Sequence, residues 1–160
     1  TVCAGDGDGD GCDHLDCHGK PFLVVFVGVG AFYDHTMSSY VYSSEANAWS
    51  ESAHYQYLGH FSESRSTLVE NALYFAVNKS PGILKYNLGT REVTAISRLP
   101  MLNPHIALMT AEGGGLGCAT MRSSKLCLWS AEVRPDGDIG WALGKTIELS
   151  TLVPAGHSVR

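Results

Sequence analysis

The chain repeats itself with a period of about 44 residues, and this repeat constrains the fold more than any other feature. Tyr42 precedes Tyr86 by 44 positions, and Tyr86 precedes Trp129 by 43. A repeat of this length is typical of a propeller blade, or of another array in which each unit buries its apolar face against its neighbours. The sequence therefore predicts a repeat architecture.

The apolar runs inside each repeat predict β-strands. In the middle repeat, runs rich in Val, Leu, Tyr and Phe are separated by turn residues. We expect four antiparallel strands there, the make-up of one propeller blade, at 66–69, 72–77, 82–87 and 92–96. The third repeat predicts strands at 106–109, 117–121, 125–129 and 141–147. The first predicts a weak or lost first strand, followed by strands at 22–27, 39–43 and 49–52.

These strands predict an all-β, kelch-like partial β-propeller of about three four-stranded antiparallel blades, with no helix. Residues 1–20 are expected to form an acidic loop rich in Gly, Asp, Cys and His, and 21–160 the blades, at about 21–60, 61–100 and 101–153. A closed propeller has about four to eight blades. The chain, which begins with Thr1, is therefore expected to be an open fragment of a larger ring or a truncated form, with sheet edges that favour association.

Two places where the repeat fails are predicted to be partner surfaces. The second and third strands are 17 positions apart in the first repeat, from Val25 to Tyr42, against 11 in the others, so an insertion lies near 30–35. The outer hairpin of the third repeat, 132–140, is also longer. Loops between strands tolerate insertions and carry much binding function. The loop 30–37 also contributes the rings of Phe32, Tyr33 and His35.

Charge and apolar patterning exclude several classes of partner. Residues 1–20 carry five acids against Lys20, which leaves 11 acids and 10 bases in 21–160. The basic face of a nucleic-acid-binding protein is therefore not expected. The apolar runs are shorter than the roughly 20 residues that span a bilayer, so no membrane contact is predicted. Five cysteines without a secretory leader favour reduced thiols, and thus a cytoplasmic location, a nuclear one, or both.

The acidic loop holds the residues nearest to a metal site, yet we assign neither a metal nor a cofactor. Asp6–Gly11 resembles the first half of a calcium loop, but position twelve is Cys17 in place of the bidentate glutamate. Cys12, His14, Cys17 and His18 are four possible zinc ligands, although closed zinc sites draw their ligand pairs from well-separated segments. A polar loop is the preferred interpretation, and metal binding by these residues stays open.

No catalytic residues are predicted. The run Gly113–Gly117 lacks the Lys-Ser/Thr that ends a phosphate-binding P-loop, so we expect a hairpin turn there. No Gly-x-Ser-x-Gly elbow occurs, and no spacing singles out a catalytic triad. Trp49, Trp129 and Trp141 could be binding hot spots, but their matched places in the repeat favour packing between blades.

Several segments of 21–153 carry a resemblance to a known family. They are the strand and turn motifs at 41–50, 68–75, 83–88, 113–118, 126–129 and 140–149. Together they resemble the kelch-like propeller domain that lies carboxyl-terminal to the F-box in many plant F-box proteins, and the loop 12–19 is similar as well. The F-box itself, which docks on the ligase adaptor, is not among these 160 residues.

The resemblance implies a non-enzymatic protein–protein interaction module, the substrate-recognition domain of an SCF-type ubiquitin ligase subunit. Its partner is then a protein substrate of unknown identity, and the adaptor is reached only through an F-box outside this sequence. Two alternatives stay open: a free-standing kelch-like binding or scaffold protein and, with less support, a propeller-fold hydrolase such as a glycan-processing enzyme. An F-box upstream of Thr1 would distinguish the ligase subunit from the free-standing scaffold.

Overall fold

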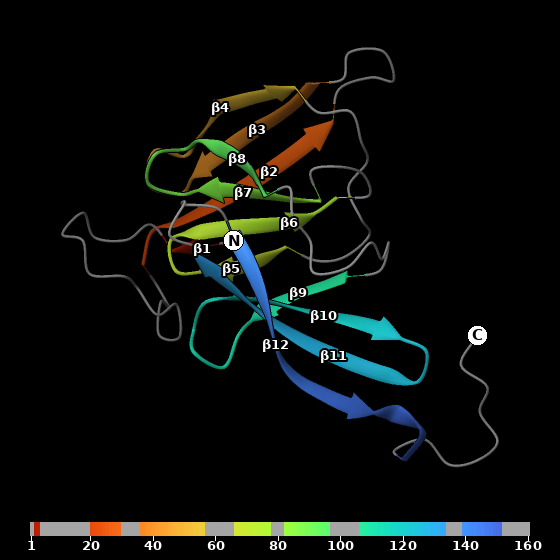
Figure 1. The fold of residues 1–160 in the computed structure, drawn as a ribbon. Coiled ribbons are helices and arrows are strands. Elements are labelled where there is room, and N and C mark those ends of the chain that lie inside the picture. The colour runs from red at the N-terminus through yellow and green to blue at the C-terminus, as the bar shows by residue number, and fades with distance from the viewer. Residues whose placement is uncertain are drawn as a thin grey trace.

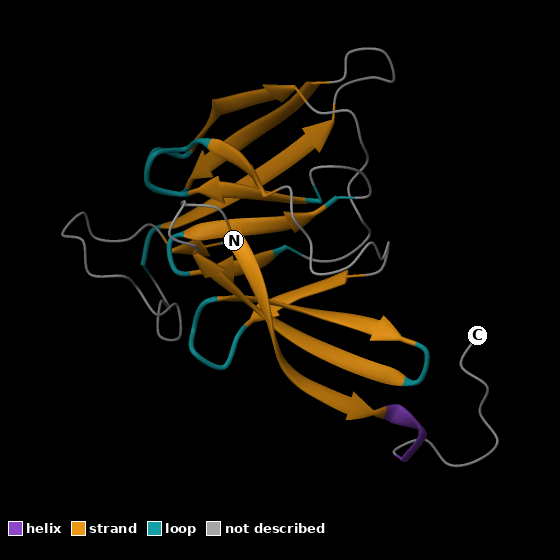
Figure 2. Cartoon of the chain, viewed as in Figure 1, coloured by secondary structure: helices purple, strands orange, loops and turns teal. Residues whose placement is uncertain are grey.

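The computed structural model describes residues 2–3, 20–29, 36–56, 66–77, 82–96, 106–133 and 139–151 of the chain. Within these ranges the protein is all-β, as predicted (Figures 1 and 2). The described part contains twelve strands, and its only helix is the single 3₁₀ turn η1 (Leu149–Thr151). None of these residues forms a helix with the length and apolar character needed to cross a membrane.

The strands form three sheets of four, with antiparallel neighbours throughout. The first sheet has the order β1 (Val2–Cys3), β2 (Phe22–Val29), β3 (Thr36–Ser43), β4 (Ala48–Gln56). The middle sheet has the order β5 (Thr67–Val69), β6 (Ala72–Ala76), β7 (Ile83–Asn87), β8 (Val93–Ile96). The third sheet has the order β12 (Ile139–Glu148), β11 (Lys125–Val133), β10 (Leu116–Arg122), β9 (Ile106–Thr110).

One period of the repeat corresponds to one sheet. Tyr42, Tyr86 and Trp129 lie on the third strands β3, β7 and β11. Their partners on the second strands are, in the same order, Val24, Leu73 and Cys118. In the middle sheet the predicted strands agree with the observed ones to within one residue at each end. The prediction of three four-stranded antiparallel units is therefore confirmed.

Tight turns connect the strands where the sequence places small polar residues. The turn after β7 is held by Asn87, whose side-chain Oδ1 accepts hydrogen bonds from the backbone N–H groups of Gly89 at 2.9 Å and Thr90 at 3.0 Å. Asn47 has a φ of 48° in the β3–β4 turn and Gly114 a φ of 85° in the β9–β10 turn, values that these residue types tolerate. The hairpin turn predicted at 113–117 is confirmed, although its last two residues belong to β10.

The middle sheet packs face to face between the other two sheets (Figure 1). Successive side chains of a strand point to opposite faces, so alternate residues of β6 serve the two contacts. Tyr74 and Ala76 pack with residues of the third sheet. Leu73 and Phe75 pack with residues of the first. Each sheet thus buries an apolar face against a neighbour, as a repeat array requires.

Two apolar interfaces hold this stack together. Between the first and middle sheets, Val41 packs with Leu73 and Tyr86, and Tyr86 is only 1% exposed. Between the middle and third sheets, Ile83 packs in one cluster with Leu116. Burying one large apolar side chain contributes roughly 1.5–3 kcal/mol. The sheet contacts are therefore the main source of stability in the described part of the chain.

Some strands of the first and third sheets are longer than predicted: β3 begins at Thr36 and β4 ends at Gln56, whereas the sequence predicts strands at 39–43 and 49–52. The first strand of the first sheet, expected to be weak or lost, is the two-residue β1, which pairs with β2 and satisfies backbone groups along its edge. In the third sheet, part of the predicted loop 132–140 is strand, since Glu132 pairs with Gly140. The insertion predicted near 30–35 lies outside the described residues.

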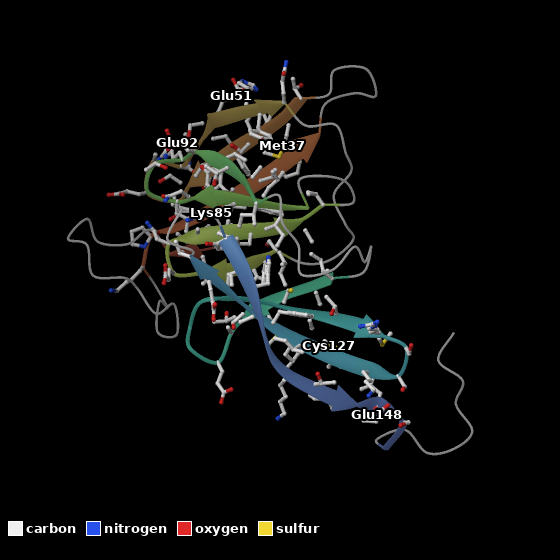
Figure 3. The ribbon with its side chains drawn as sticks, in the orientation of Figure 1. Met37, Glu51, Lys85, Glu92, Cys127 and Glu148 are labelled. Atoms are coloured by element: carbon white, nitrogen blue, oxygen red, sulfur yellow. The ribbon has the colours of Figure 1, made fainter. Side chains whose placement is uncertain are left out.

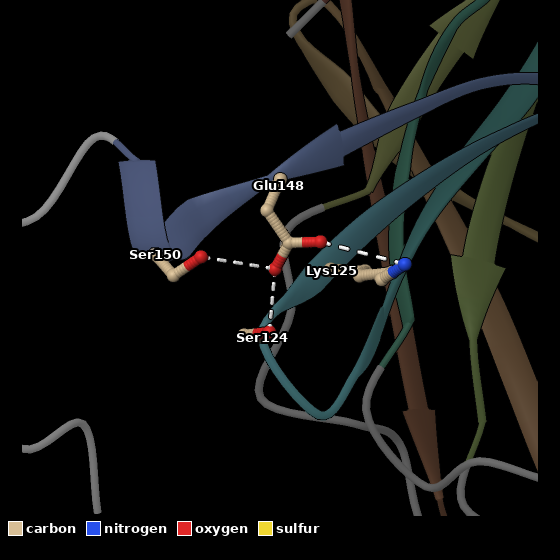
Figure 4. A network of polar contacts seen from close by, with 4 residues as sticks. All are labelled: Ser124, Lys125, Glu148 and Ser150. Carbon is tan, nitrogen blue, oxygen red and sulfur yellow. Dashed lines mark hydrogen bonds and ion pairs between the residues drawn. The ribbon is translucent and has the colours of Figure 1, made fainter.

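A polar network ties η1 to the hairpin between β10 and β11 (Figure 4). One carboxylate oxygen of Glu148 accepts hydrogen bonds from the hydroxyls of Ser124 at 2.6 Å and Ser150 at 3.2 Å. The other lies 3.4 Å from Nζ of Lys125. The hydrogen bond from Ser124, helped by Ser150 and Lys125, holds the pKa of Glu148 below its ordinary value. The network is exposed, so its contribution to stability is small.

Glu148→Gln is expected to lower the melting temperature slightly near neutral pH and to leave it unchanged in acid. A carboxyl group with a lowered pKa in the folded state stabilises that state at pH values above the pKa of the unfolded chain, and this stabilisation is lost as the pH falls through the folded pKa. Thermal melts over a pH series measure the effect, with Glu112→Gln in the exposed β9–β10 turn as the control. A difference between wild type and Glu148→Gln that persists in acid would contradict this account.

Candidate functional site: the aromatic face of the first sheet

The first sheet buries one face and exposes the other. Leu23, Val25 and Val27 of β2 pack in the apolar clusters shared with the middle sheet. Phe22 and Phe26 alternate with them and therefore lie on the opposite face. Side chains of β3 and β4 that share this outer face also carry rings. The resulting group, which we call the aromatic face, consists of Phe22, Phe26, Tyr40, Tyr42 and Trp49.

The rings of the aromatic face contact one another across three strands. The ring centroids of Phe22 and Tyr42 are 6.2 Å apart and those of Tyr42 and Trp49 are 5.5 Å apart, which makes a row from β2 to β4. Phe26 and Tyr40 form a second pair at 6.5 Å. All three contacts are tilted, a geometry that is favourable between aromatic rings. Apart from Tyr42, which is half-buried, these residues are still between 36% and 56% exposed.

Hydrogen bonds hold the row of rings at its turn end. The hydroxyl of Tyr42 donates to Oδ1 of Asn47 in the β3–β4 turn at 2.8 Å. The backbone N–H of Phe22 donates to Oγ of Ser44 in the same turn at 2.7 Å. Groups that are ordered before binding lose less conformational entropy when a partner docks. The aromatic face is therefore a preorganised surface.

A β-bulge adds polar side chains to the rim of the aromatic face. The register between β3 and β4 shifts between Ser39 and Tyr40, so that β4 carries one extra residue after Glu51, which pairs with Tyr40, and before His54, which pairs with Ser38. Without this bulge, Glu51 and His54 would point to opposite faces, because they are three positions apart. With it, Nε2 of His54 lies 3.3 Å from Oε1 of Glu51, and Nδ1 lies 3.1 Å from Oγ of Ser38.

The contacts of Ser38, His54 and Glu51 have the order of a hydrolase triad, in which a histidine bridges a serine and a carboxylate. Such triads work where water is excluded and oxyanion donors are preorganised. Here the side chains of His54 and Glu51 are 61% and 52% exposed, and Figure 3 shows Glu51 on β4 at the opposite end of the stack from the third sheet. We therefore interpret these residues as the hydrogen-bonding rim of the aromatic face.

The prediction that the three tryptophans pack between blades is wrong for Trp49. This residue is 56% exposed, because it lies on the outer face of the first sheet. Trp141 is partly buried and packs in the cluster between the middle and third sheets, as predicted. Trp129 is half-buried, and its Nε1 donates to Oγ1 of the buried Thr120 at 2.9 Å. The covering sheet, and not the residue type, decides which tryptophan is exposed.

Other candidates from the sequence are not part of this face. Met37, which falls in the predicted partner loop 30–37, is 1% exposed, so the prediction is wrong at that position. Outside the described residues lie the rest of that loop's candidates, Phe32, Tyr33 and His35. Outside them too lie Asp6–Gly11 and Cys12, His14, Cys17 and His18. In the described ranges, no three His, Cys, Asp or Glu side chains form a group that could hold a metal ion.

Phe22, Phe26 and Tyr40 were not identified as surface residues from the sequence. The run 22–27 is apolar at every position, so its pattern gives no sign of which side chains face outward. The order of the repeats does indicate which face of the first sheet points outward. Tyr42 matches Tyr86, which faces a preceding sheet, whereas among the described residues the equivalent face of the first sheet meets no other sheet.

Comparison of the chain with models of known protein families finds no match, and neither curated proteins nor solved structures yield a similar protein. Contiguous exposed apolar side chains with a polar rim mark interaction surfaces in soluble proteins. The aromatic face fits this description.

Proposed function

We propose that the protein is a non-enzymatic protein–protein interaction module that binds its partner through the aromatic face. The observation that carries this proposal is the set of exposed rings, in mutual contact, on the outer side of the first sheet. Tryptophan and tyrosine are enriched among the residues that dominate binding energy at protein interfaces. Their rings supply large contact areas together with a polar group that a partner can hydrogen-bond.

The finer proposal is that this module is the substrate-recognition domain of an F-box, SCF-type ubiquitin ligase subunit, with its sheets as blades of a kelch-like propeller. Support comes from the resemblance of the sequence motifs and from the stacking of three four-stranded antiparallel sheets in repeat order. The ligase adaptor would be reached through an F-box outside this sequence. The alternative is a free-standing kelch-like scaffold that uses the same face without a ligase.

Capture experiments test the binding surface. The full chain, immobilised at low density, is expected to retain specific proteins from a cell extract. A variant carrying Phe26→Ser and Trp49→Ser is expected to recover at least about tenfold less of them, because truncating a central aromatic residue weakens binding by roughly 2 kcal/mol or more. Quantitative mass spectrometry of the bound fraction gives the measurement. Leu143→Ser is the matched control, since Leu143 is an apolar residue of the third sheet that is 52% exposed and lies outside the predicted partner loops.

Unchanged recovery with the double variant, in a protein that melts at the wild-type temperature, would exclude the aromatic face as the binding surface. The ligase role has its own measurement. Proteins captured through this face should accumulate in cells when the proteasome is inhibited. Capture without such accumulation favours the scaffold alternative.

A further inference from the structure

The repeat gives each sheet two distinct faces. On the third strands, Tyr42, Tyr86 and Trp129 occupy the same face of their sheets, which in the middle and third sheets is turned toward the preceding sheet. The residues one position earlier, Val41, Lys85 and Leu128, occupy the opposite face, which in the first and middle sheets is turned toward the following sheet. Contacts confirm the direction in the middle sheet, where Tyr86 packs with Val41 of the first sheet. We call these two sides the preceding face and the following face of a sheet.

Both sheet contacts inside the chain join the same two kinds of face. The following face of the first sheet covers the preceding face of the middle sheet, and Val41 and Tyr86 are 2% and 1% exposed there. The following face of the middle sheet, with Tyr74 and Ile83, packs on the preceding face of the third, with Leu116. The stack therefore follows one rule: in both contacts, the following face of one sheet covers the preceding face of the next sheet.

This rule leaves one face of each kind without a neighbouring sheet among the described residues. The aromatic face is the preceding face of the first sheet. The other is the following face of the third sheet, on which Ala119 pairs with Leu128 and Met121 pairs with Leu126. Met121 is 45% exposed, and the other three are half-buried. Both ends of the stack thus present apolar side chains.

The two open faces are complementary in chemistry. One presents flat rings, and the other presents aliphatic side chains and a methionine, whose sulfur makes favourable contacts with rings. The same combination occurs inside the chain, where Val41 packs on Tyr86. The charges also agree, because Lys145 pairs with Leu128 on the third sheet, whereas Glu51 pairs with Tyr40 on the aromatic face.

We propose that the aromatic face binds the following face of the third sheet of a second copy of this chain. The proposal rests on the proposed function in one respect, the use of the aromatic face as the protein-binding surface. Two copies joined in this way use each open face once and form a closed ring of six sheets, which lies within the about four to eight blades of closed propellers. Three copies would give nine sheets. A second copy and any other protein partner then compete for the aromatic face.

The oligomeric state of the full chain tests this proposal. Sedimentation velocity over a range of concentrations is expected to show a species of twice the chain mass and nothing larger. A charge placed in an apolar interface is poorly solvated, so Trp49→Glu and Leu128→Glu are each expected to weaken the dimer at least about tenfold. Leu143→Glu is the control that leaves it intact, because Leu143 pairs with Trp129 on the preceding face of the third sheet. Circular dichroism and thermal melts verify folding, and Trp49→Ser and Leu128→Ser replace a variant that does not fold.

Mixing the two variants gives the most specific result. In a head-to-tail dimer of Trp49→Glu with Leu128→Glu, one contact carries both substitutions and the other is wild type. The mixture is therefore expected to form a 1:1 complex that neither variant forms alone. If only Trp49→Glu abolishes the dimer, the aromatic faces pair with each other and the proposal is wrong.

Two further results would overturn the second-copy proposal: a monomer at every concentration, and an open filament, which forms when a head-to-tail contact does not close. Neither result decides the proposed function. If the chain is a monomer and the variant carrying Phe26→Ser and Trp49→Ser still recovers fewer proteins than wild type, the aromatic face remains a protein-binding surface. A monomer that captures the same proteins with and without these substitutions overturns both proposals.

Discussion

Tyr86→Ala is expected to destabilise the protein by roughly 3–5 kcal/mol, the range found when a buried aromatic residue is truncated. Tyr86 is 1% exposed and packs with Val41 and Leu73 between the first and middle sheets. Its removal leaves a cavity at the interface that joins the two sheets. Urea denaturation, followed by circular dichroism, measures the loss.

Tyr42→Ala is the matched control, because Tyr42 occupies the same position in the preceding repeat. Its ring lies on the outer face of the first sheet, and its hydroxyl donates to Asn47. The expected loss is roughly 1–2 kcal/mol, because the substitution removes one hydrogen bond and the partly exposed ring contacts with Phe22 and Trp49. Tyr86→Phe keeps the ring and removes the hydroxyl, and therefore separates the contributions of the two groups to stability. Equal losses for Tyr42→Ala and Tyr86→Ala would show that the two faces of the stack are covered to the same extent, contrary to the structure.

Cys118 is expected to react with iodoacetamide at pH 8 roughly 10³-fold more slowly in the folded protein than in the unfolded chain. Burial raises the pKa of this thiol from 9.0 to about 12, and the thiolate is the reactive form. The residue is also fully buried in the third sheet, which limits access of the reagent. Quenched labelling, followed by mass spectrometry of the peptide that contains Cys118, resolves this site from the other cysteines.

The direction of the pKa shift adds a pH dependence to this prediction. A thiol whose pKa is raised in the folded state stabilises that state fully below the unfolded pKa of 9.0, and the contribution is lost as the pH rises toward 12. Cys118→Ala should therefore reduce the loss of stability over this alkaline range. Equal labelling rates in native buffer and in guanidinium chloride would contradict the buried position of Cys118.

The strands of the middle sheet follow from local features of the sequence. Turn residues such as Asn71 and Asn87 border short apolar runs, and the observed strands β5 to β8 begin and end within one residue of the predicted limits. The Gly113–Gly117 turn was recognisable for the same reason. Turn chemistry and strand propensity act over a few residues, so a single sequence is enough to locate them.

The candidate site was only partly predictable, because its features depend on contacts between distant strands. Trp49 has the residue type of Trp141, yet Trp141 packs between two sheets and Trp49 is exposed. The rim residues Glu51 and His54 share a face only because a β-bulge separates them. This bulge depends on the pairing of β4 with β3, and no motif in the sequence predicts it.

The all-β class, the repeat of about one sheet per 44 residues and most strand limits can be predicted from the sequence, because they depend on local propensity and periodicity. Which face of each sheet is buried follows instead from the packing of the sheets against one another. Tyr42 and Tyr86 are equivalent in the repeat, but a sheet covers Tyr86, whereas the rings around Tyr42 remain exposed. Burial depends on what packs against a face, and for these sheets the covering residues lie tens of positions away in the chain.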